Sequence, residues 1–132
     1  MRERVMKKYI KTDINSYSHT SGGFGDERIV LARYNAKASN EYSEGDTVTL
    51  VKDGFNCYVE IEDPRGDLVY NEFYLMKDIK SAIADFNEQA RAKGNWRTLT
   101  LNDVKFHLSE GYGISLDDYL PGGFYDEIRK PR

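Results

Sequence analysis

An amphipathic segment past the middle of the chain narrows the choice of architecture more than any other stretch. Its apolar residues recur every three or four positions: Ile79, Ala82, Ile83, Phe86 and Ala90. Polar residues are expected on the opposite side of the helical wheel: Lys80, Asp85, Glu88 and Arg91. This spacing predicts a long amphipathic helix over about 77–93, ended by Gly94. Such a helix needs a second layer to cover its apolar stripe.

The segments before this helix are typical of β-strands. Runs rich in β-branched and aromatic residues predict strands at 28–34, 47–51, 55–62 and 67–75, with a weaker candidate at 5–14. Asp63-Pro64-Arg65-Gly66 supplies the torsions of a tight turn between the last two strands, because Pro fixes φ and Gly allows positive φ. The order of strands and then helices indicates an antiparallel sheet rather than alternating β-α-β units.

Shorter helices are expected after Gly94. Thr100 with Asp103 forms a capping pattern that predicts a helix over 101–110, ended by Gly111. Ser115 followed by two aspartates predicts a further short turn, stopped by Pro121-Gly122-Gly123. We therefore expect an α+β fold: an antiparallel sheet of about four to five strands in the N-terminal two-thirds, packed on one face by the helix at about 77–93 and by one or two shorter C-terminal helices. The chain, residues 1–132, is expected to be a single globular domain, since its length suffices for one core.

Period-two alternation predicts which side chains of the last two strands lie together. Cys57 is expected to point inward with Phe55, Val59 and Ile61, which turns Tyr58, Glu60 and Glu62 outward. If Val69, Phe73 and Leu75 also face inward, then Tyr70, Glu72 and Tyr74 join the outward set. One sheet face would then present an acidic, tyrosine-rich surface.

The distribution of charge favours a basic partner. Residues 38–72 hold nine acidic and two basic side chains, and residues 98–128 hold six acidic and one basic, whereas residues 1–11 carry five basic and one acidic. The overall charge of −3 therefore conceals a polarised molecule. Because nucleic-acid binders present a basic stripe, direct nucleic-acid binding is not expected. Acidic surfaces instead complement basic protein surfaces.

The pattern Gly-Gly-Phe-x-Asp-Glu occurs twice, at 22–27 and at 122–127. Each copy joins a flexible turn to an aromatic ring and two carboxylates, so both copies enter the predicted partner-binding set. This set adds Phe24, Asp26, Glu27, Phe124, Tyr125, Asp126 and Glu127 to the sheet residues. We expect Phe24 and Phe124 to flank one patch if the copies lie close together; otherwise chance explains the repeat.

Catalytic and metal-binding patterns are not found in the sequence. His107 is expected to be structural, because it lies between Phe106 and Leu108 in a predicted helix, and His19 lies in a serine-rich loop without an indicated carboxylate partner. Cys57 is the one cysteine and is interpreted as a buried structural thiol. Two histidines and one cysteine far apart lack the spacing of a zinc site. We predict no catalytic residue, no cofactor and no metal.

The sequence favours a cytoplasmic location in a bacterial host cell. No apolar run is long enough to span a bilayer, and the basic N-terminus lacks the apolar segment of a signal peptide. Arg2-Glu3-Arg4 is compatible with a purine-rich ribosome-binding site before Met6, which suggests a bacterial or phage gene that starts at Met6.

These observations predict a small non-enzymatic inhibitor that blocks a basic, nucleic-acid-binding protein through its acidic tyrosine-rich surface. Anti-CRISPR and anti-restriction proteins of phages and mobile elements work in this style. Three alternatives stay open: an immunity protein or antitoxin that neutralises a toxin, a nucleic-acid-binding module that uses aromatic stacking, and a small enzyme that uses His19 or His107.

Overall fold

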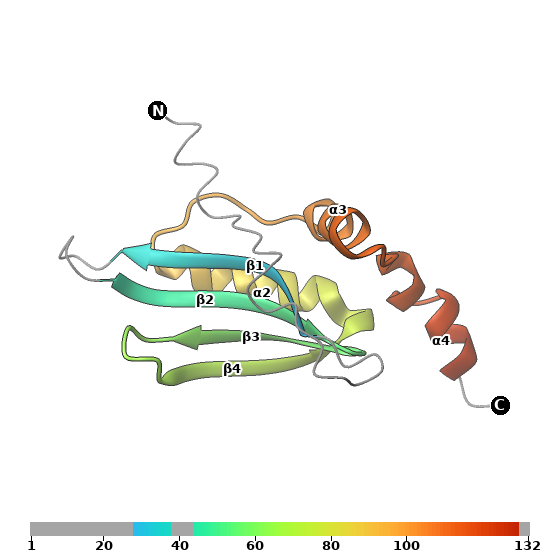
Figure 1. The fold of residues 1–132 in the computed structure, drawn as a ribbon, viewed down its shortest axis with the longest axis horizontal. Coiled ribbons are helices and arrows are strands. Elements are labelled where there is room, and N and C mark those ends of the chain that lie inside the picture. The colour runs from blue at the N-terminus through green and yellow to red at the C-terminus, as the bar shows by residue number, and fades with distance from the viewer. Residues whose placement is uncertain (1–27, 38–43, 130–132) are drawn as a thin grey trace.

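The computed structural model describes residues 28–37 and 44–129, which form an antiparallel sheet with helices, so the α+β prediction is confirmed. The described residues contain four strands: β1 (Arg28–Lys37), β2 (Glu44–Asp53), β3 (Asn56–Glu62) and β4 (Leu68–Leu75). Each strand pairs antiparallel with its neighbour in sequence, in the order β1-β2-β3-β4 (Figure 1). The predicted strand at 5–14 lies outside the described residues.

The turns of the sheet follow from local side-chain chemistry. Between β3 and β4, the Asp63 carboxylate accepts hydrogen bonds from the backbone N–H groups of Arg65 and Asp67, at 3.0 and 2.9 Å. Gly66 has φ of 90°, a conformation that residues with a Cβ rarely adopt. This is the tight turn that the sequence predicts.

Helix α2 (Ile79–Ala92) provides the second layer and follows β4 through the short 3-10 turn η1 (Met76–Asp78). It lies behind the sheet in Figure 1 and packs against β2, β3 and β4. Its whole apolar stripe is buried, as predicted, and Ile79 and Phe86 are fully inaccessible. Burial of a side chain of this size contributes about 1.5–3 kcal/mol to folding. The helix is followed by Gly94 at φ of 108°.

The C-terminal part of the described chain contains α3 (Leu101–Tyr112), the 3-10 turn η2 (Leu116–Tyr119) and α4 (Phe124–Arg129). Thr100 and Asp103 form the predicted capping box. The predicted end of α3 at Gly111 is wrong: the helix continues to Tyr112, because the left-handed residue that ends it is Gly113, with φ of 66°. Helix α4 was not predicted, since a turn and not a helix was expected at 121–123.

Three of the four β3-segment residues expected in the core are buried there. The core between sheet and helices includes Cys57 and Val59 at 0 % exposure and Ile61 at 3 %, as predicted, whereas Phe55 is 41 % exposed at the β2–β3 turn. The predicted inward position of Phe55 is therefore wrong. Within the described residues, no helix combines the length and the apolar character that crossing a bilayer requires.

Candidate partner-binding surface

The predicted tyrosine-rich sheet face does not exist as one surface. In the β3–β4 ladder Tyr58 lies opposite Phe73, and Cys57 lies opposite Tyr74. Directly opposed residues share a face, so β4 has the opposite orientation from the one predicted. Tyr70, Glu72 and Tyr74 lie on the helix side of the sheet. The side turned away from α2, here called the far side, carries these residues of β3 and β4: Tyr58, Glu60, Glu62, Val69, Asn71, Phe73 and Leu75.

A buried carboxylate on α2 explains this orientation of β4. The Asp85 side chain accepts hydrogen bonds from the hydroxyl of Tyr70 at 2.9 Å, from that of Tyr74 at 2.8 Å and from the Gln89 amide at 3.1 Å. Asp85 is only 9 % exposed, so the predicted placement of Asp85 on the polar side of the helix is wrong. Burial, the hydrogen bond to Asp85 and its negative charge together raise the pKa of Tyr70 to about 12, and the same causes raise that of Tyr74. We call Tyr70, Tyr74, Asp85 and Gln89 the Asp85 cluster.

On the far side, Tyr58 and Glu60 are also less available than the sequence suggests. Tyr58 is 7 % exposed, and the Arg28 guanidinium lies 5.4 Å from the centre of its ring. The same guanidinium lies 3.9 Å from the Glu60 carboxylate. Burial raises the pKa of Glu60, and the charge of Arg28 opposes that rise. Among the six predicted sheet residues, only Glu62 and Glu72 are exposed, and they lie on opposite sides of the sheet.

A different group of rings gathers at one end of the sheet. Phe55, in the β2–β3 turn, has its ring centre 5.6 Å from that of Tyr119 and 5.1 Å from that of Tyr125. Tyr119 and Tyr125 are 4.9 Å apart, and Phe124 is 5.2 Å from Tyr125. Phe124 is 59 % exposed. We call these four residues the aromatic corner.

Carboxylates flank the aromatic corner on its own chain segment. Asp118 precedes Tyr119, and Asp126 follows Tyr125. The Lys52 ammonium lies 4.6 Å from the centre of the Tyr119 ring, although Lys52 itself is only 4 % exposed. A ring of the corner therefore already interacts with a cation through its π-face. This arrangement of tyrosines and carboxylates can bind guanidinium or ammonium groups.

The second copy of the repeated motif forms the turn that leads into α4. Gly122 has φ of 84°, and a Cβ on Gly123 would lie 2.8 Å from the carbonyl carbon of Asp118. The Asp126 carboxylate accepts a hydrogen bond from the Gly122 N–H at 2.9 Å. The two glycines and the aspartate are thus required by the local backbone. The first copy, with Phe24, Asp26 and Glu27, lies outside the described residues, as does the Glu127 side chain.

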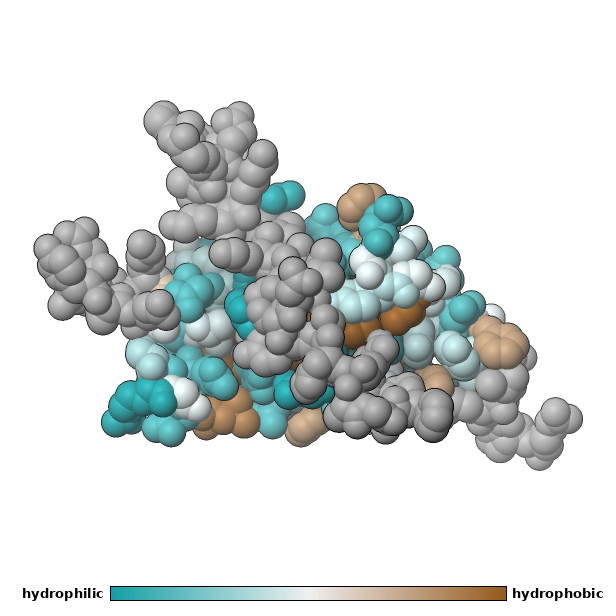
Figure 2. Space-filling model, in the orientation of Figure 1, coloured by the Kyte–Doolittle hydropathy of each residue, from teal (hydrophilic) through white to brown (hydrophobic). Residues whose placement is uncertain are grey.

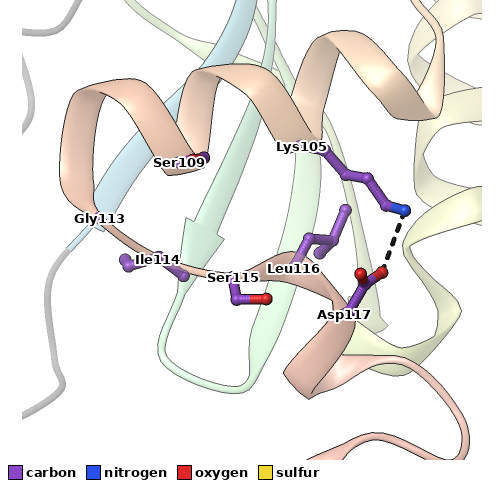
Figure 3. Close-up of a pocket in the computed structure, with 7 residues that line it drawn as sticks. All are labelled: Lys105, Ser109, Gly113, Ile114, Ser115, Leu116 and Asp117. Atoms are coloured by element: carbon purple, nitrogen blue, oxygen red, sulfur yellow. Dashed lines mark ion pairs between the residues drawn. The ribbon is translucent and has the colours of Figure 1, made fainter.

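A shallow groove of about 350 Å³ lies between α3 and the segment that follows it (Figure 3). It is lined by Lys105, Ser109, Gly113, Ile114, Ser115, Leu116 and Asp117. At one end the Lys105 ammonium and the Asp117 carboxylate form an ion pair at 3.0 Å, drawn as the dashed line in Figure 3. The lining residues include neither His nor Cys, and the Lys105 ammonium is held in the ion pair with Asp117.

His107 and Cys57 are both buried. His107 is 6 % exposed, its Nε2 lies 3.0 Å from the Val30 carbonyl of β1, and burial lowers its pKa. Burial, assisted by the charge of Asp78, raises the pKa of the Cys57 thiol to about 12. Both were interpreted as structural from the sequence, whereas His19 lies outside the described residues. Across residues 28–37 and 44–129, no group of three or more His, Cys, Asp or Glu side chains is placed to hold a metal.

Comparison with known proteins does not add to this picture. No family model, no curated protein and no solved structure matches the chain. The structure thus brings together three predicted residues, Phe124, Tyr125 and Asp126. It adds Phe55, Tyr119 and Asp118, which the predicted set did not include. The sequence signal that could have found Tyr119 is its position in an acidic, tyrosine-containing stretch beside Asp117 and Asp118. The turn residue Phe55 carries no such signal.

Proposed function

We propose that the protein is a non-enzymatic binding protein that docks its aromatic corner onto a basic surface of a partner protein. The observation that carries the proposal is the contact of Phe55, Tyr119 and Tyr125 beside an exposed Phe124 and two carboxylates. Interfaces favour such residues, because aromatic rings supply large contact area at low entropic cost and tyrosine adds a polar tip.

The charge of the surroundings defines the class of partner. Residues 98–128 carry six acidic and one basic side chain, and the Lys105 ammonium is already paired with Asp117. A surface of this sign attracts Arg and Lys side chains and repels phosphate groups. Basic surfaces with these side chains are typical of nucleic-acid-binding proteins. We therefore propose that the protein occupies the nucleic-acid-binding surface of such a partner in the cytoplasm of a bacterial host, in the style of phage-encoded inhibitors.

Affinity capture from bacterial lysate tests this proposal, with matched variants of the bait. Phe124→Ala removes an exposed ring of the corner, and Asp118→Lys reverses a flanking charge. Phe106→Ala is the control, because Phe106 is 69 % exposed on α3 and is not one of the four rings of the corner. We expect one basic protein to be captured by the native chain and by the control. Both corner variants should lose most of it, since truncation of a hot-spot ring costs about 2 kcal/mol or more.

The captured partner is then tested for inhibition. Its binding to a labelled nucleic acid should fall as the native protein is added and should persist with Phe124→Ala. Equal capture by all four baits, or a captured partner whose nucleic-acid binding is unaffected, would contradict the proposal. Direct binding of the purified protein to single-stranded DNA or RNA at low salt would instead favour the stacking module.

A further inference from the structure

The outer edge of β4 is a second surface, separate from the aromatic corner. Among the described residues, no strand lies beyond β4. The Met76 N–H donates to the Phe55 carbonyl at 2.7 Å, which fixes the direction of the backbone groups in this ladder. Because these directions alternate along an antiparallel strand, the N–H and C=O groups of Asn71 and Phe73 and the N–H of Leu75 point away from β3, whereas the Leu75 carbonyl accepts a hydrogen bond from the Cys57 thiol. A further strand can pair with them.

Three side chains along this edge are apolar and exposed. Val69, Phe73 and Leu75 lie on the far side with 56 %, 63 % and 47 % of their surface exposed. Figure 2 shows hydrophobic atoms along the lower border of the molecule, where Figure 1 places β4. Natural edge strands are usually shielded by Lys, Pro or inward-pointing charges. Residues 68–75 contain neither Lys nor Pro, so this edge is shielded by Glu72 on the helix side and by the register shift near Val69, and Asn71 to Leu75 carry no charge on the far side.

We propose that β4 pairs with β4 of a second copy of this chain, antiparallel, about a two-fold axis through Phe73. Phe73 then faces its own counterpart, and Asn71 faces Leu75 of the partner subunit. The Phe73 ring already lies 5.2 Å from that of Tyr58. Pairing extends this contact into a row of four rings across the far side, which buries the most exposed hydrophobic side chain of the strand. An isologous contact of this kind closes as a dimer and leaves no new edge.

The pattern of charge and register disfavours three neighbouring positions of the axis. An axis through Glu72 would place two carboxylates directly opposite each other. An axis through Asn71 would need regular pairing at Val69, where the β3–β4 register shifts between Ile61 and Glu62. An axis between two residues would pair far-side residues of one strand with helix-side residues of the other. The helix side of one sheet would then be continuous with the far side of the other. The axis through Phe73 places Glu72 opposite Tyr74 of the partner subunit.

Sedimentation velocity of the full chain over the micromolar range tests the proposal. The native chain should show a concentration-dependent dimer, and Phe73→Asp should weaken it roughly 100-fold or more, because two carboxylates would meet on the axis. Phe106→Asp, at an equally exposed ring on α3, should dimerise like the native chain. Urea unfolding of each variant verifies that it is folded, which the exposure of both rings leads us to expect.

Charge pairing identifies the axis itself. Phe73→Asp and Phe73→Lys should each be monomeric alone, and their mixture should restore a heterodimer through opposite charges at the axis. A native chain that is monomeric at every concentration would overturn the proposal, as would a dimer that survives Phe73→Asp. Failure of the Asp and Lys variants to associate with each other would overturn the register.

Discussion

Replacement of Asp85 by Asn should destabilise the protein by about 2 kcal/mol, because it weakens a group of buried hydrogen bonds. The Asp85 carboxylate accepts three side-chain hydrogen bonds, two of them from tyrosine hydroxyls at 2.8 and 2.9 Å. Hydrogen bonds to a charged acceptor contribute about 1.5–3 kcal/mol each, against about 1 kcal/mol for neutral pairs. Asn keeps the shape but removes the charge and replaces one acceptor oxygen with a donor.

The magnitude follows from these bonds and from the burial of their donors. Two tyrosine bonds that each weaken by about 1 kcal/mol give an expected loss of about 2 kcal/mol. Removal of the cost of burying a charge opposes this loss. Asn keeps one acceptor oxygen, however, and that oxygen replaces two that accept from both tyrosine hydroxyls and the Gln89 amide. Because both tyrosine rings are half-buried, water reaches them and keeps the value at the lower end of the range.

Urea unfolding followed by circular dichroism measures this loss, and a double-mutant cycle with Tyr74→Phe tests its cause. The coupling energy between Asp85→Asn and Tyr74→Phe should be about 1 kcal/mol or more, because both changes remove the same bond. Tyr112→Phe, at a tyrosine outside the Asp85 cluster, should show additive behaviour. A loss below about 0.5 kcal/mol for Asp85→Asn, or additivity with Tyr74→Phe, would refute the reasoning.

Three further predictions concern titration, reactivity and backbone space. The pKa of Tyr70 is raised to about 12 in the folded chain, against about 10 when unfolded. Because the unfolded state releases its proton first, the free energy of unfolding should fall as pH rises from about 10 through about 12. Urea unfolding midpoints should show this decline, and Tyr70→Phe should lessen it. Cys57 is fully buried, and its thiol pKa is raised to about 12. It should therefore not react with a thiol reagent at mildly alkaline pH until urea unfolds the chain. Rapid reaction without urea would contradict its burial. Gly123→Ala should lower the free energy of unfolding by about 1–3 kcal/mol, because its Cβ would lie 2.8 Å from the Asp118 carbonyl carbon. In the same unfolding assay, Gly111→Ala within α3 should be neutral or stabilising. Equal stability of both variants would contradict the close approach.

The parts of the fold that could be predicted are those set by neighbours in sequence. The stripe of α2 predicts its burial because periodicity alone determines which side faces the sheet. The Thr100–Asp103 capping box and the Asp63–Gly66 turn depend on residues within four positions of each other. Each of these elements was located correctly, and only the end of α3 was missed, by two residues.

The orientation of β4 could not be predicted because both of its faces carry large rings. Alternation places Tyr70 and Tyr74 on one side and Phe73 and Leu75 on the other, so hydropathy favours burying the second pair. In the structure, Tyr70 and Tyr74 face the helix instead, because the Asp85 carboxylate accepts hydrogen bonds from both tyrosine hydroxyls. Asp85 borders the apolar stripe, one residue before Phe86, and this position was the available clue.

The aromatic corner depends on contacts between distant parts of the chain. Phe55 belongs to a turn, and Tyr119 and Tyr125 belong to C-terminal elements whose positions no local pattern fixes. The repeated motif pointed to the correct segment, but its glycines and Asp126 serve the backbone turn. Its Phe124 and Tyr125 are the members that reach the surface.

The meander order of the sheet has a consequence for how the chain folds. Every strand pairs with the strand next to it in sequence, and α2 follows β4 directly, so this part needs only short loop closures and should form quickly. The hydrogen bond between His107 and Val30 joins residues that are 77 positions apart in the sequence, and its formation closes a long loop of the chain. During synthesis, the sheet and α2 can therefore assemble before α3 emerges from the ribosome. Docking of α3 on β1 is then the late step that commits the chain to its native state, and a chain that stops before Leu101 would leave β1 without its covering helix.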